Sequence, residues 1–238
     1  MIKRILSTTL VLSALAVVLG FASAEMENRR VEVMDIQIKD AQKAAFLDAQ
    51  RIHSELGSSQ YEGQPLHDVD LQGILDLLLD LPACDHAEVY SKMNGTVHID
   101  LWQRHPVMRV HTPDGEDYYL DETGRRMALD KYYTPHIPVM HVARESQANM
   151  GYRFVKATQN DPFWNALTDQ LSMNESGELI LHPRLAGHDI VLGNASNSEH
   201  KKRNLIAFYR AHVKRGNLRN FKRIDLTYSD QVIAQRYP

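Results

Sequence analysis

The stretch that decides the fold covers residues 94–107, NGTVHIDLWQRHPV. Asn-Gly followed by an alternating apolar segment is a strong short-range signal for a β-hairpin, because both residues tolerate a positive φ. The pattern therefore predicts a strand over residues 96–101, paired with residues 87–90. Proline cannot donate a hydrogen bond to a β-ladder, so we expect this strand to end at Pro106. The chain can then begin a second sheet.

Residues upstream of the hairpin predict a small unit of strand, helix, helix, strand and strand. Residues 31–38 alternate in polarity as a half-buried strand does. Residues 40–56 predict a helix that ends at Gly57. Leucine and isoleucine then recur at three- and four-residue spacing over 71–81, which predicts an amphipathic helix that Pro82 stops. Two helices on one face of a small sheet would give this unit a core.

The chain beyond Pro106 predicts a second, strand-rich domain with flanking helices. We expect strands at 108–111, 118–120, 127–129, 136–142, 179–183, 190–192 and 223–236, and helices at 163–171 and 197–213. In the last helix, the side chains expected to face the core are Leu205, Phe208, Tyr209 and Val213. The predicted fold class is α+β.

Composition excludes several classes of protein. The 238-residue chain carries 27 basic and 30 acidic residues, a near balance that creates no overall field for nucleic acid. Hydrophobic residues make up 43% of the chain, which allows a sizeable core. Only one cysteine is present, Cys84, so no internal disulfide can form.

The N-terminus carries the strongest compositional signal. Lys3 and Arg4 precede an uncharged run over residues 5–24, which as a helix would span about 30 Å, the thickness of a bilayer's hydrocarbon core. The A-x-A pattern at 22–24 favours a cleavable signal peptide, whereas the length of the run favours an uncleaved signal anchor, and the residues alone leave both open. The basic pair predicts a cytoplasmic N-terminus in either case, so that residues from Glu25 onward lie outside the cytoplasm.

Twelve histidines invite a metal-site hypothesis, but their spacing argues against it. They are scattered, and neither H-x-x-x-H nor H-E-x-x-H occurs. His105 and His111 could face each other, yet satisfied or solvated histidines are the more common case. Nucleophilic catalysis also lacks a template, since there is no G-x-S-x-G and Cys84 sits in an apolar context where a thiol is usually inert. The sequence therefore predicts no catalytic, cofactor-binding or metal-binding residues.

A basic cluster lies between residues 201 and 223, a segment that contains no acidic residue. Its functional interpretation is an electropositive surface for an acidic partner segment or an anionic lipid. The alternative is a solvated helix face, with cations near a helix C-terminus where the macrodipole favours them. The candidates for an electropositive contact surface are Lys201, Lys202, Arg203 and Arg210.

Short motifs follow one another in a fixed order along most of the chain. They are Gln103-Arg104-His105-Pro106-Val107, Tyr118-Tyr119-Leu120-Asp121-Glu122-Thr123-Gly124, Asp161-Pro162-Phe163-Trp164, Gly177-Glu178-Leu179, His182-Pro183-Arg184, Gly187-His188, Leu192-Gly193, Leu205-Ile206-Ala207-Phe208-Tyr209 and Ile224-Asp225-Leu226-Thr227-Tyr228. No single motif is specific. Together with the apolar N-terminal segment and the strand-helix-helix-strand-strand unit, the ordered series resembles the bacterial cell-division family FtsQ, called DivIB in other bacteria, and most of all FtsQ from the Bacteroidetes group.

The resemblance implies a chain in three parts. These are a cytoplasmic tip with an uncleaved transmembrane signal anchor at 1–24, a POTRA-like domain at 25–106 and an FtsQ-type β domain at 107–238. Arg104 and Pro106 would then lie at the junction of the two folded domains.

The resemblance also implies a non-enzymatic divisome assembly protein without cofactors. It would cross the inner membrane once, with most of the chain in the periplasm at the division site. Its partners would be FtsB and FtsL, with other division proteins contacting the POTRA-like domain, and it would bind neither nucleic acid nor a small-molecule substrate.

The last strand is the candidate docking edge for these partners. A strand at the chain end has a good chance of lying at a sheet edge, where unpaired N–H and C=O groups can receive a partner strand. The alternative is an ordinary terminal strand whose side chains merely fill a core. The resemblance assigns partner binding to the final strand and its tyrosine, here Tyr228, Asp230, Gln231, Val232, Ile233, Ala234, Gln235 and Arg236. Within this strand, Ile233 is a candidate for a residue whose N–H points outward, toward a partner.

A second function from a different class remains open. The chain could be a secreted or outer-membrane-associated POTRA module that binds unfolded or partner polypeptides by strand addition. An enzyme would instead need titratable side chains converging in a pocket.

The anchor and the secreted alternative differ in one measurable property. If residues 1–24 form an anchor, the native protein should keep them, and intact mass spectrometry of the protein from its own cells should give the mass of the uncleaved chain. A mature protein that begins at Glu25 would rule out the anchor.

Overall fold

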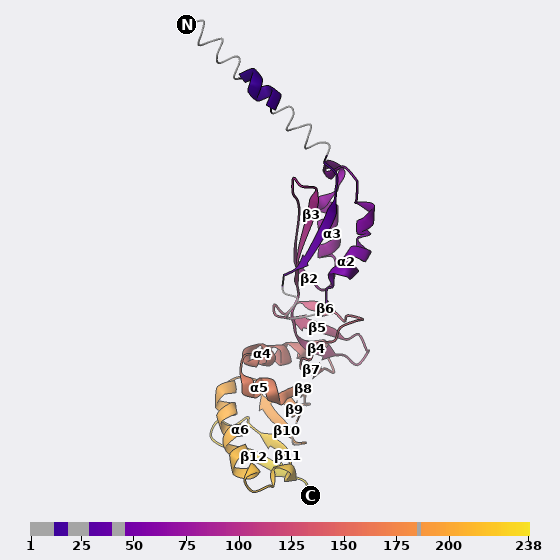
Figure 1. Ribbon diagram of the computed structural model, residues 1–238. Coiled ribbons are helices and arrows are strands. Elements are labelled where there is room, and N and C mark those ends of the chain that lie inside the picture. The colour runs from indigo at the N-terminus through magenta and orange to yellow at the C-terminus, as the bar shows by residue number, and fades with distance from the viewer. Residues whose placement is uncertain (1–11, 19–28, 40–45, 185–186) are drawn as a thin grey trace. The chain divides into compact units, whose positions relative to one another are not determined.

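The computed structural model describes residues 12–18, 29–39, 46–184 and 187–238 (Figure 1). The chain divides into two compact units, Met1–Gln103 and Arg104–Pro238, each with its own sheet.

The predicted N-terminal anchor falls largely outside these residues. Of segment 1–24, only residues 12–18 are described, and they are helical. Within the described ranges, no helix combines the length and the hydropathy that crossing a bilayer requires.

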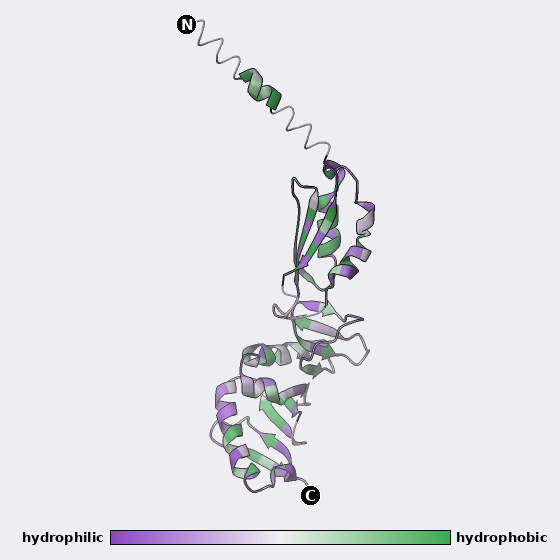
Figure 2. Cartoon of the chain, viewed as in Figure 1, coloured by the Kyte–Doolittle hydropathy of each residue, from purple (hydrophilic) through white to green (hydrophobic). Residues whose placement is uncertain are grey.

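The first unit has the predicted order of strand, helix, helix, strand and strand. Its elements are β1 (Val33–Ile38), α2 (Ala49–Glu55), the 3₁₀ turns η1 (Ser58–Gln60) and η2 (Leu66–Asp68), α3 (Leu71–Leu79), β2 (Cys84–Ser91) and β3 (Thr96–Gln103). Strand β3 lies in the middle of the sheet, parallel to β1 and antiparallel to β2. Helix α3 is largely green, or hydrophobic, in Figure 2, and it buries Ile74 and Leu78 almost completely. This face supplies the core of the unit, as the leucine spacing predicts.

Helix α2 is shorter than the predicted helix over 40–56. It begins at Ala49 because Asp48 caps it, with Oδ1 of Asp48 accepting a hydrogen bond from the N–H of Arg51 at 3.0 Å. The C-terminal end agrees with the prediction, since Gly57 has the left-handed φ of 58° that commonly follows a helix. The remainder of the predicted helix, residues 40–45, lies outside the described residues.

The hairpin between β2 and β3 has a different turn from the one expected. The N–H of Lys92 donates to the carbonyl of Thr96 at 2.9 Å, which leaves residues 93–95 as a three-residue loop. Gly95 has a φ of 86°, whereas Asn94 does not need a positive φ. Three-residue hairpin loops place a single left-handed residue at the end of the turn, and glycine adopts that conformation without strain.

The second unit contains a nine-stranded sheet and three α-helices. Its elements are β4 (Pro106–His111), β5 (Tyr118–Asp121), β6 (Arg126–Ala128), β7 (Val139–His141), η3 (Glu145–Gln147), α4 (Ala148–Thr158), α5 (Pro162–Leu167), β8 (Thr168–Met173), β9 (Leu179–Pro183), β10 (Asp189–Gly193), α6 (Ser198–Val213), η4 (Leu218–Asn220), β11 (Phe221–Asp225) and β12 (Ile233–Arg236). The strand order is β12-β11-β10-β9-β8-β7-β4-β5-β6. The three helices lie on the same face of the sheet (Figure 1).

The core of the second unit lies between this helical layer and the sheet. Side chains alternate along each strand, so every second residue reaches the helices. Met108, Leu171 and Ile190 are fully buried from the sheet side, and Phe154 and Trp164 fill the helical side with ring centroids 5.3 Å apart. The strand-rich α+β prediction is confirmed for this unit.

The structure of the second unit differs from the prediction in three places. Helix α4 was not predicted, although its buried residues Ala148, Gly151, Phe154, Val155 and Thr158 recur at helical spacing. The helix predicted over 163–171 ends at Leu167, because residues 168–173 form the central strand β8. The strand predicted over 223–236 is a hairpin of β11 and β12.

The segment between the sheets also corrects the sequence analysis. Strand β3 already ends at Gln103, and Pro106 is the first residue of β4, where it pairs with Asp121. Proline suits the first position of a strand because no N–H is needed there. Pro106 therefore opens the second sheet and does not end the first.

The side chain of Asp121 forms hydrogen bonds that hold the start of this second sheet in place. Its Oδ2 accepts hydrogen bonds from Nε and Nη2 of Arg104 at 2.9 and 2.7 Å, and the two side chains are 4% and 11% exposed. Its Oδ1 accepts hydrogen bonds from the N–H and hydroxyl of Thr123 and from the N–H of Arg125. Burial opposes ionisation of Asp121, but the bonds from Thr123, Arg104 and the backbone outweigh it, so the pKa of the carboxyl lies below its usual value.

We expect the second unit to fold by itself, provided that Arg104 is kept. Fragment 104–238 should unfold cooperatively in urea. Fragment 107–238 lacks the Arg104 guanidinium that donates twice to the buried carboxylate of Asp121, and it should be less stable by about 3 kcal/mol. A molten 104–238 fragment would show that the two units depend on each other.

Replacing Asp121 should remove a defined pH dependence. The stability that a depressed carboxyl pKa contributes is complete above the unfolded value of about 3.9 and is lost as pH falls through the folded pKa. Asp121→Asn should therefore lower the free energy of unfolding by about 3 kcal/mol at pH 7 and by less at pH 3, which lies below the unfolded value. Thermal melts across this range test it, with exposed Glu116→Gln as the matched control. Equal losses at both pH values would contradict the ion-pair account.

Candidate partner-binding edge of the nine-stranded sheet

Strand β12 forms one edge of the nine-stranded sheet and pairs with β11 alone. The N–H of Tyr237 donates inward to the carbonyl of Asn220 at 3.0 Å. Because N–H directions alternate along a strand, the N–H groups of Ile233 and Gln235 also point toward β11. Those of Ala234 and Arg236 then point away from the sheet. The outer side of β12 therefore offers backbone donors and acceptors to another strand.

Large apolar side chains are exposed along this edge. Tyr228, Ile233 and Tyr237 are 51%, 47% and 50% exposed, respectively. Val232, by contrast, packs against the hydrophobic core and Ala234 is half-buried, which fixes the register of the strand. The edge thus combines open hydrogen-bonding positions with apolar contact area.

Helix α6 holds the turn before β12 in place. The backbone carbonyl of Ser229 accepts hydrogen bonds from Nε2 of His200 and from Nδ2 of Asn204, the latter at 3.0 Å. At the start of the turn, Oδ1 of Asp225 accepts from the N–H and hydroxyl of Thr227 at 2.9 and 2.6 Å. Tyr228 is therefore presented on a turn that is fixed at both ends.

The far end of β12 is also anchored. The hydroxyl of Tyr237 donates to the carbonyl of Gly187 at 3.0 Å, and the guanidinium of Arg236 lies 5.5 Å from the ring centre of Phe221. With both ends attached, the edge is formed before any partner arrives.

The residues assigned to partner binding lie together in the structure. Asp230 and Gln231 are exposed in the turn, and Gln235 and Arg236 are exposed on the strand. One detail needs correction. Ile233 was the candidate whose N–H points outward, but its N–H points toward β11, so Ala234 takes that place.

The predicted electropositive surface does not form as a group. Lys201 is only 7% exposed, its ammonium donates to the carbonyl of Ser196, and burial lowers its pKa. Lys202 is paired with Asp161 and Glu199, and these hydrogen bonds raise its pKa. The ammonium groups of both lysines therefore already have partners within the fold.

The other two members of the predicted surface are exposed but separated. Nη2 of Arg203 lies 3.2 Å from Nδ1 of His200, near the Ser229 turn. Arg210 lies two turns further along α6. Seven residues place the two arginines on nearly the same side of α6, but about 10 Å apart along its axis, so they form no compact group.

Ser172, His182 and Asp189 form a hydrogen-bonded line on the face of the sheet opposite the helices. Oγ of Ser172 lies 2.8 Å from Nε2 of His182, and Nδ1 of His182 lies 2.7 Å from Oδ1 of Asp189. A serine nucleophile also needs N–H donors aimed at an oxyanion. Ser172 lies within strand β8, whose backbone pairs with β9, so this arrangement offers no such donors from its own strand pair. It resembles a catalytic triad in its hydrogen bonds alone.

The described part of the chain gives little support for a metal site or a reactive thiol. No three His, Cys, Asp or Glu side chains there converge to hold a metal ion. Cys84 is buried, and burial raises the pKa of its thiol to about 11, which disfavours the reactive thiolate.

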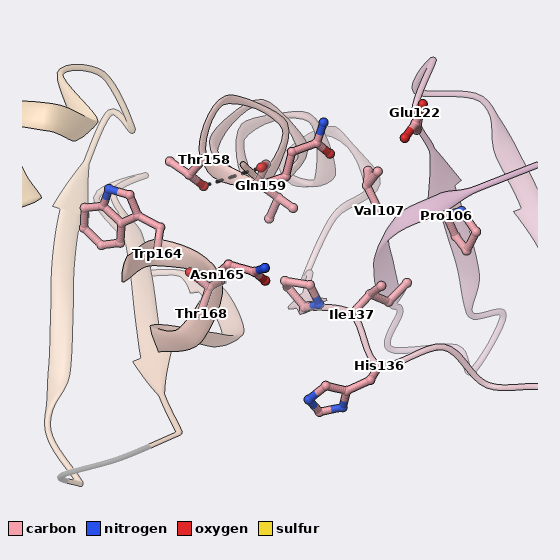
Figure 3. A pocket seen from close by; sticks show the side chains of 12 residues that line it. Pro106, Val107, Glu122, His136, Ile137, Thr158, Gln159, Trp164, Asn165 and Thr168 are labelled. Atoms are coloured by element: carbon pink, nitrogen blue, oxygen red, sulfur yellow. Dashed lines mark hydrogen bonds between the residues drawn. The ribbon is translucent and has the colours of Figure 1, made fainter. Parts of the chain in front are cut away.

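A cavity of about 240 Å³ lies among β4, the 136–138 segment and the ends of α4 and α5 (Figure 3). Apolar side chains such as Val107 and Ile137 face the amides of Gln159 and Asn165 across it. The buried hydroxyl of Thr168 has no hydrogen-bond partner within the described residues. No sequence pattern indicates this cavity, because its walls come from five separate segments of the chain.

Comparisons with known proteins agree with this architecture. Residues 30–102 match the POTRA-like domain, and residues 105–235 match the family described as FtsQ/DivIB, C-terminal related. Comparison with curated proteins gives no match. The two family matches together indicate a division-related role in protein–protein interaction. The chain belongs to the FtsQ/DivIB C-terminal related family and carries a POTRA-like domain before the region that defines that membership.

Proposed function

We propose that this chain is a non-enzymatic assembly protein of the cell-division machinery that captures partners on the β12 edge. The observation that carries the proposal is the open side of β12, with outward N–H groups at Ala234 and Arg236 beside the exposed rings of Tyr228 and Tyr237. An extended partner segment would add a tenth strand, with main-chain hydrogen bonds supplying affinity and side chains setting register.

The partners we propose for this edge are FtsB and FtsL. The chain would be anchored in the inner membrane by residues 1–24, with its N-terminus in the cytoplasm and both folded units in the periplasm at the division site. The apolar run with its preceding Lys3 and Arg4 supports this topology. We further propose that the two folded units, divided between Gln103 and Arg104, act as separate domains, the first contacting other division proteins.

A specific observation supports the alternative of a secreted POTRA module. Strands β1 and β2 are both edges of the three-stranded sheet, and β2 offers eight residues, Cys84–Ser91, for strand addition. In that case the binding edge would lie in the first unit, and substitutions in β12 would leave capture unchanged.

Two substitutions test the β12 edge. Ala234→Pro removes an outward donor and adds bulk where a partner strand would lie, so affinity should fall about tenfold. Tyr228→Ala removes an exposed aromatic ring and should cost about 2 kcal/mol, or about 30-fold in Kd, if the ring is an anchor. Both should leave the thermal melt close to that of the unchanged protein.

The measurement is a titration with the periplasmic segment of the FtsB homologue from the same organism. Ala234→Ser keeps the N–H at the same position and serves as the matched control, with affinity within about twofold. Unchanged affinity in both the proline and the alanine variants would rule out β12 as the docking edge.

A further inference from the structure

A second surface with the character of a docking site is lined by side chains of helices α5 and α6. It is a groove of about 510 Å³ into which only apolar atoms face. Its lining consists of Phe163, Ile206, Tyr209, Arg210, Val213 and Lys214. The five residues from α6 recur at three- and four-residue spacing, so they form one stripe along the helix.

This stripe shares only Tyr209 with the stripe that attaches α6 to the core. Leu205 is fully buried, and Phe208 contacts Phe221 of β11 with ring centroids 5.1 Å apart. Val213 was expected in the core, yet its side chain is 59% exposed because it belongs to the second stripe. Helix α6 therefore has two apolar faces, of which the sheet covers one.

The wall of the groove is held in place. Nε2 of His188, which is itself 1% exposed, lies 2.8 Å from the hydroxyl of Tyr209. Burial raises the pKa of this hydroxyl far above its ordinary value, so it stays protonated. With the hydroxyl attached to His188, the ring of Tyr209 keeps one orientation and the groove is pre-formed, which lowers the entropic cost of binding.

The charge at the rim is positive and uncompensated. Because only apolar atoms face the groove, Arg210 and Lys214 line it with their aliphatic stems. Neither side chain has an ion pair or hydrogen bond within the described residues, in contrast to Lys202 with its two carboxylates. No acidic residue occurs between Glu199 and Asp225, so nothing nearby in the sequence offsets these cations.

We propose that this groove binds an amphipathic helix of a protein partner, with an apolar stripe flanked by Asp or Glu. Such a helix would place its apolar side chains against Phe163, Ile206 and Val213 and its carboxylates near Arg210 and Lys214. Helix-in-groove recognition uses anchors at the same three- and four-residue spacing. A membrane surface fits less well, because lipid insertion needs apolar side chains that protrude, whereas these line a hollow.

The groove and the β12 edge share no residue. The Ser229 turn is attached to His200 and Asn204, in the first half of α6, and the groove begins at Ile206. One partner with a helix followed by a strand, or two different partners, could therefore occupy both surfaces at once.

The test uses the full chain in nanodiscs of zwitterionic lipid and a fluorescent synthetic helix. The probe has about 18 residues, or five turns, with Leu at positions i, i+3, i+4 and i+7 and Glu on both flanks. A second peptide carries Gln in place of every Glu. Anisotropy should show that the Glu peptide binds at least about tenfold more tightly than the Gln peptide, with affinity that falls as salt rises.

Substitutions locate the binding. Val213→Asp, and Arg210→Glu combined with Lys214→Glu, should each weaken binding of the Glu peptide by about tenfold or more. Arg219→Glu, an exposed charge reversal outside the groove, should change it by less than about twofold. The Ala234→Pro variant should bind the Glu peptide as tightly as the unchanged protein does, which separates this surface from the β12 edge.

Three results would overturn the proposal. These are equal affinity for the Glu and Gln peptides, no binding of the Glu peptide by the unchanged protein, and groove variants that bind as well as Arg219→Glu. Flotation with phosphatidylglycerol vesicles tests the alternative that the groove binds a membrane surface. If the groove variants reduce vesicle binding while the peptide never binds, the surface recognises anionic lipid instead of a helix.

Discussion

The second unit depends on one buried carboxylate. Asp121 joins the residue that precedes β4 to the turn between β5 and β6, through Arg104 on one oxygen and Thr123 and Arg125 on the other. Strand β4 in turn pairs with β5 on one side and β7 on the other, so its position sets where the strands after it begin. A buried ion pair adds little net stability unless its hydrogen bonds are satisfied. Here they are, and the pair serves to select one register.

Once that register is set, the two faces of the sheet take different roles. The face toward the helices is apolar and buried. On the opposite face, ionisable side chains pair with one another across neighbouring strands, as Asp117 does with Arg109 and His111, and His182 does with Asp189. A face whose charges are already paired has little left to offer a partner. Binding capacity therefore concentrates at the β12 edge and in the groove beside α6.

Periodicity in the sequence was sufficient to predict secondary structure where one pattern dominated a segment. The leucine spacing in α3 and the alternation in β1 and β3 left no competing structure, and the first unit follows the predicted order. The series of short motifs identified the family that the comparisons found. These signals are local, or they depend only on order along the chain.

The errors arose where distant contacts decide the structure. Residues 168–173 suit a helix as well as a strand, and the pairing with β7 and β9 makes them β8. Lys201 has the charge of a surface residue, yet the position of α6 over the sheet buries it. Two features of the binding surfaces, the N–H direction of Ile233 and the separation of Arg210 from Lys202, depend on strand pairing and helix phase. A single sequence does not specify these contacts.

The two attachments of β12 have a mechanical consequence. A four-residue edge strand would normally peel from its neighbour one hydrogen bond at a time when its end is pulled. Here the carbonyl of Ser229 is tied to α6 at one end, and the hydroxyl of Tyr237 is tied to Gly187 at the other. A load applied to either end is therefore shared between the ladder and an attachment outside it. Tension from a bound partner would pass into α6 and the sheet beneath it, so that the hairpin resists shear as one body with the domain.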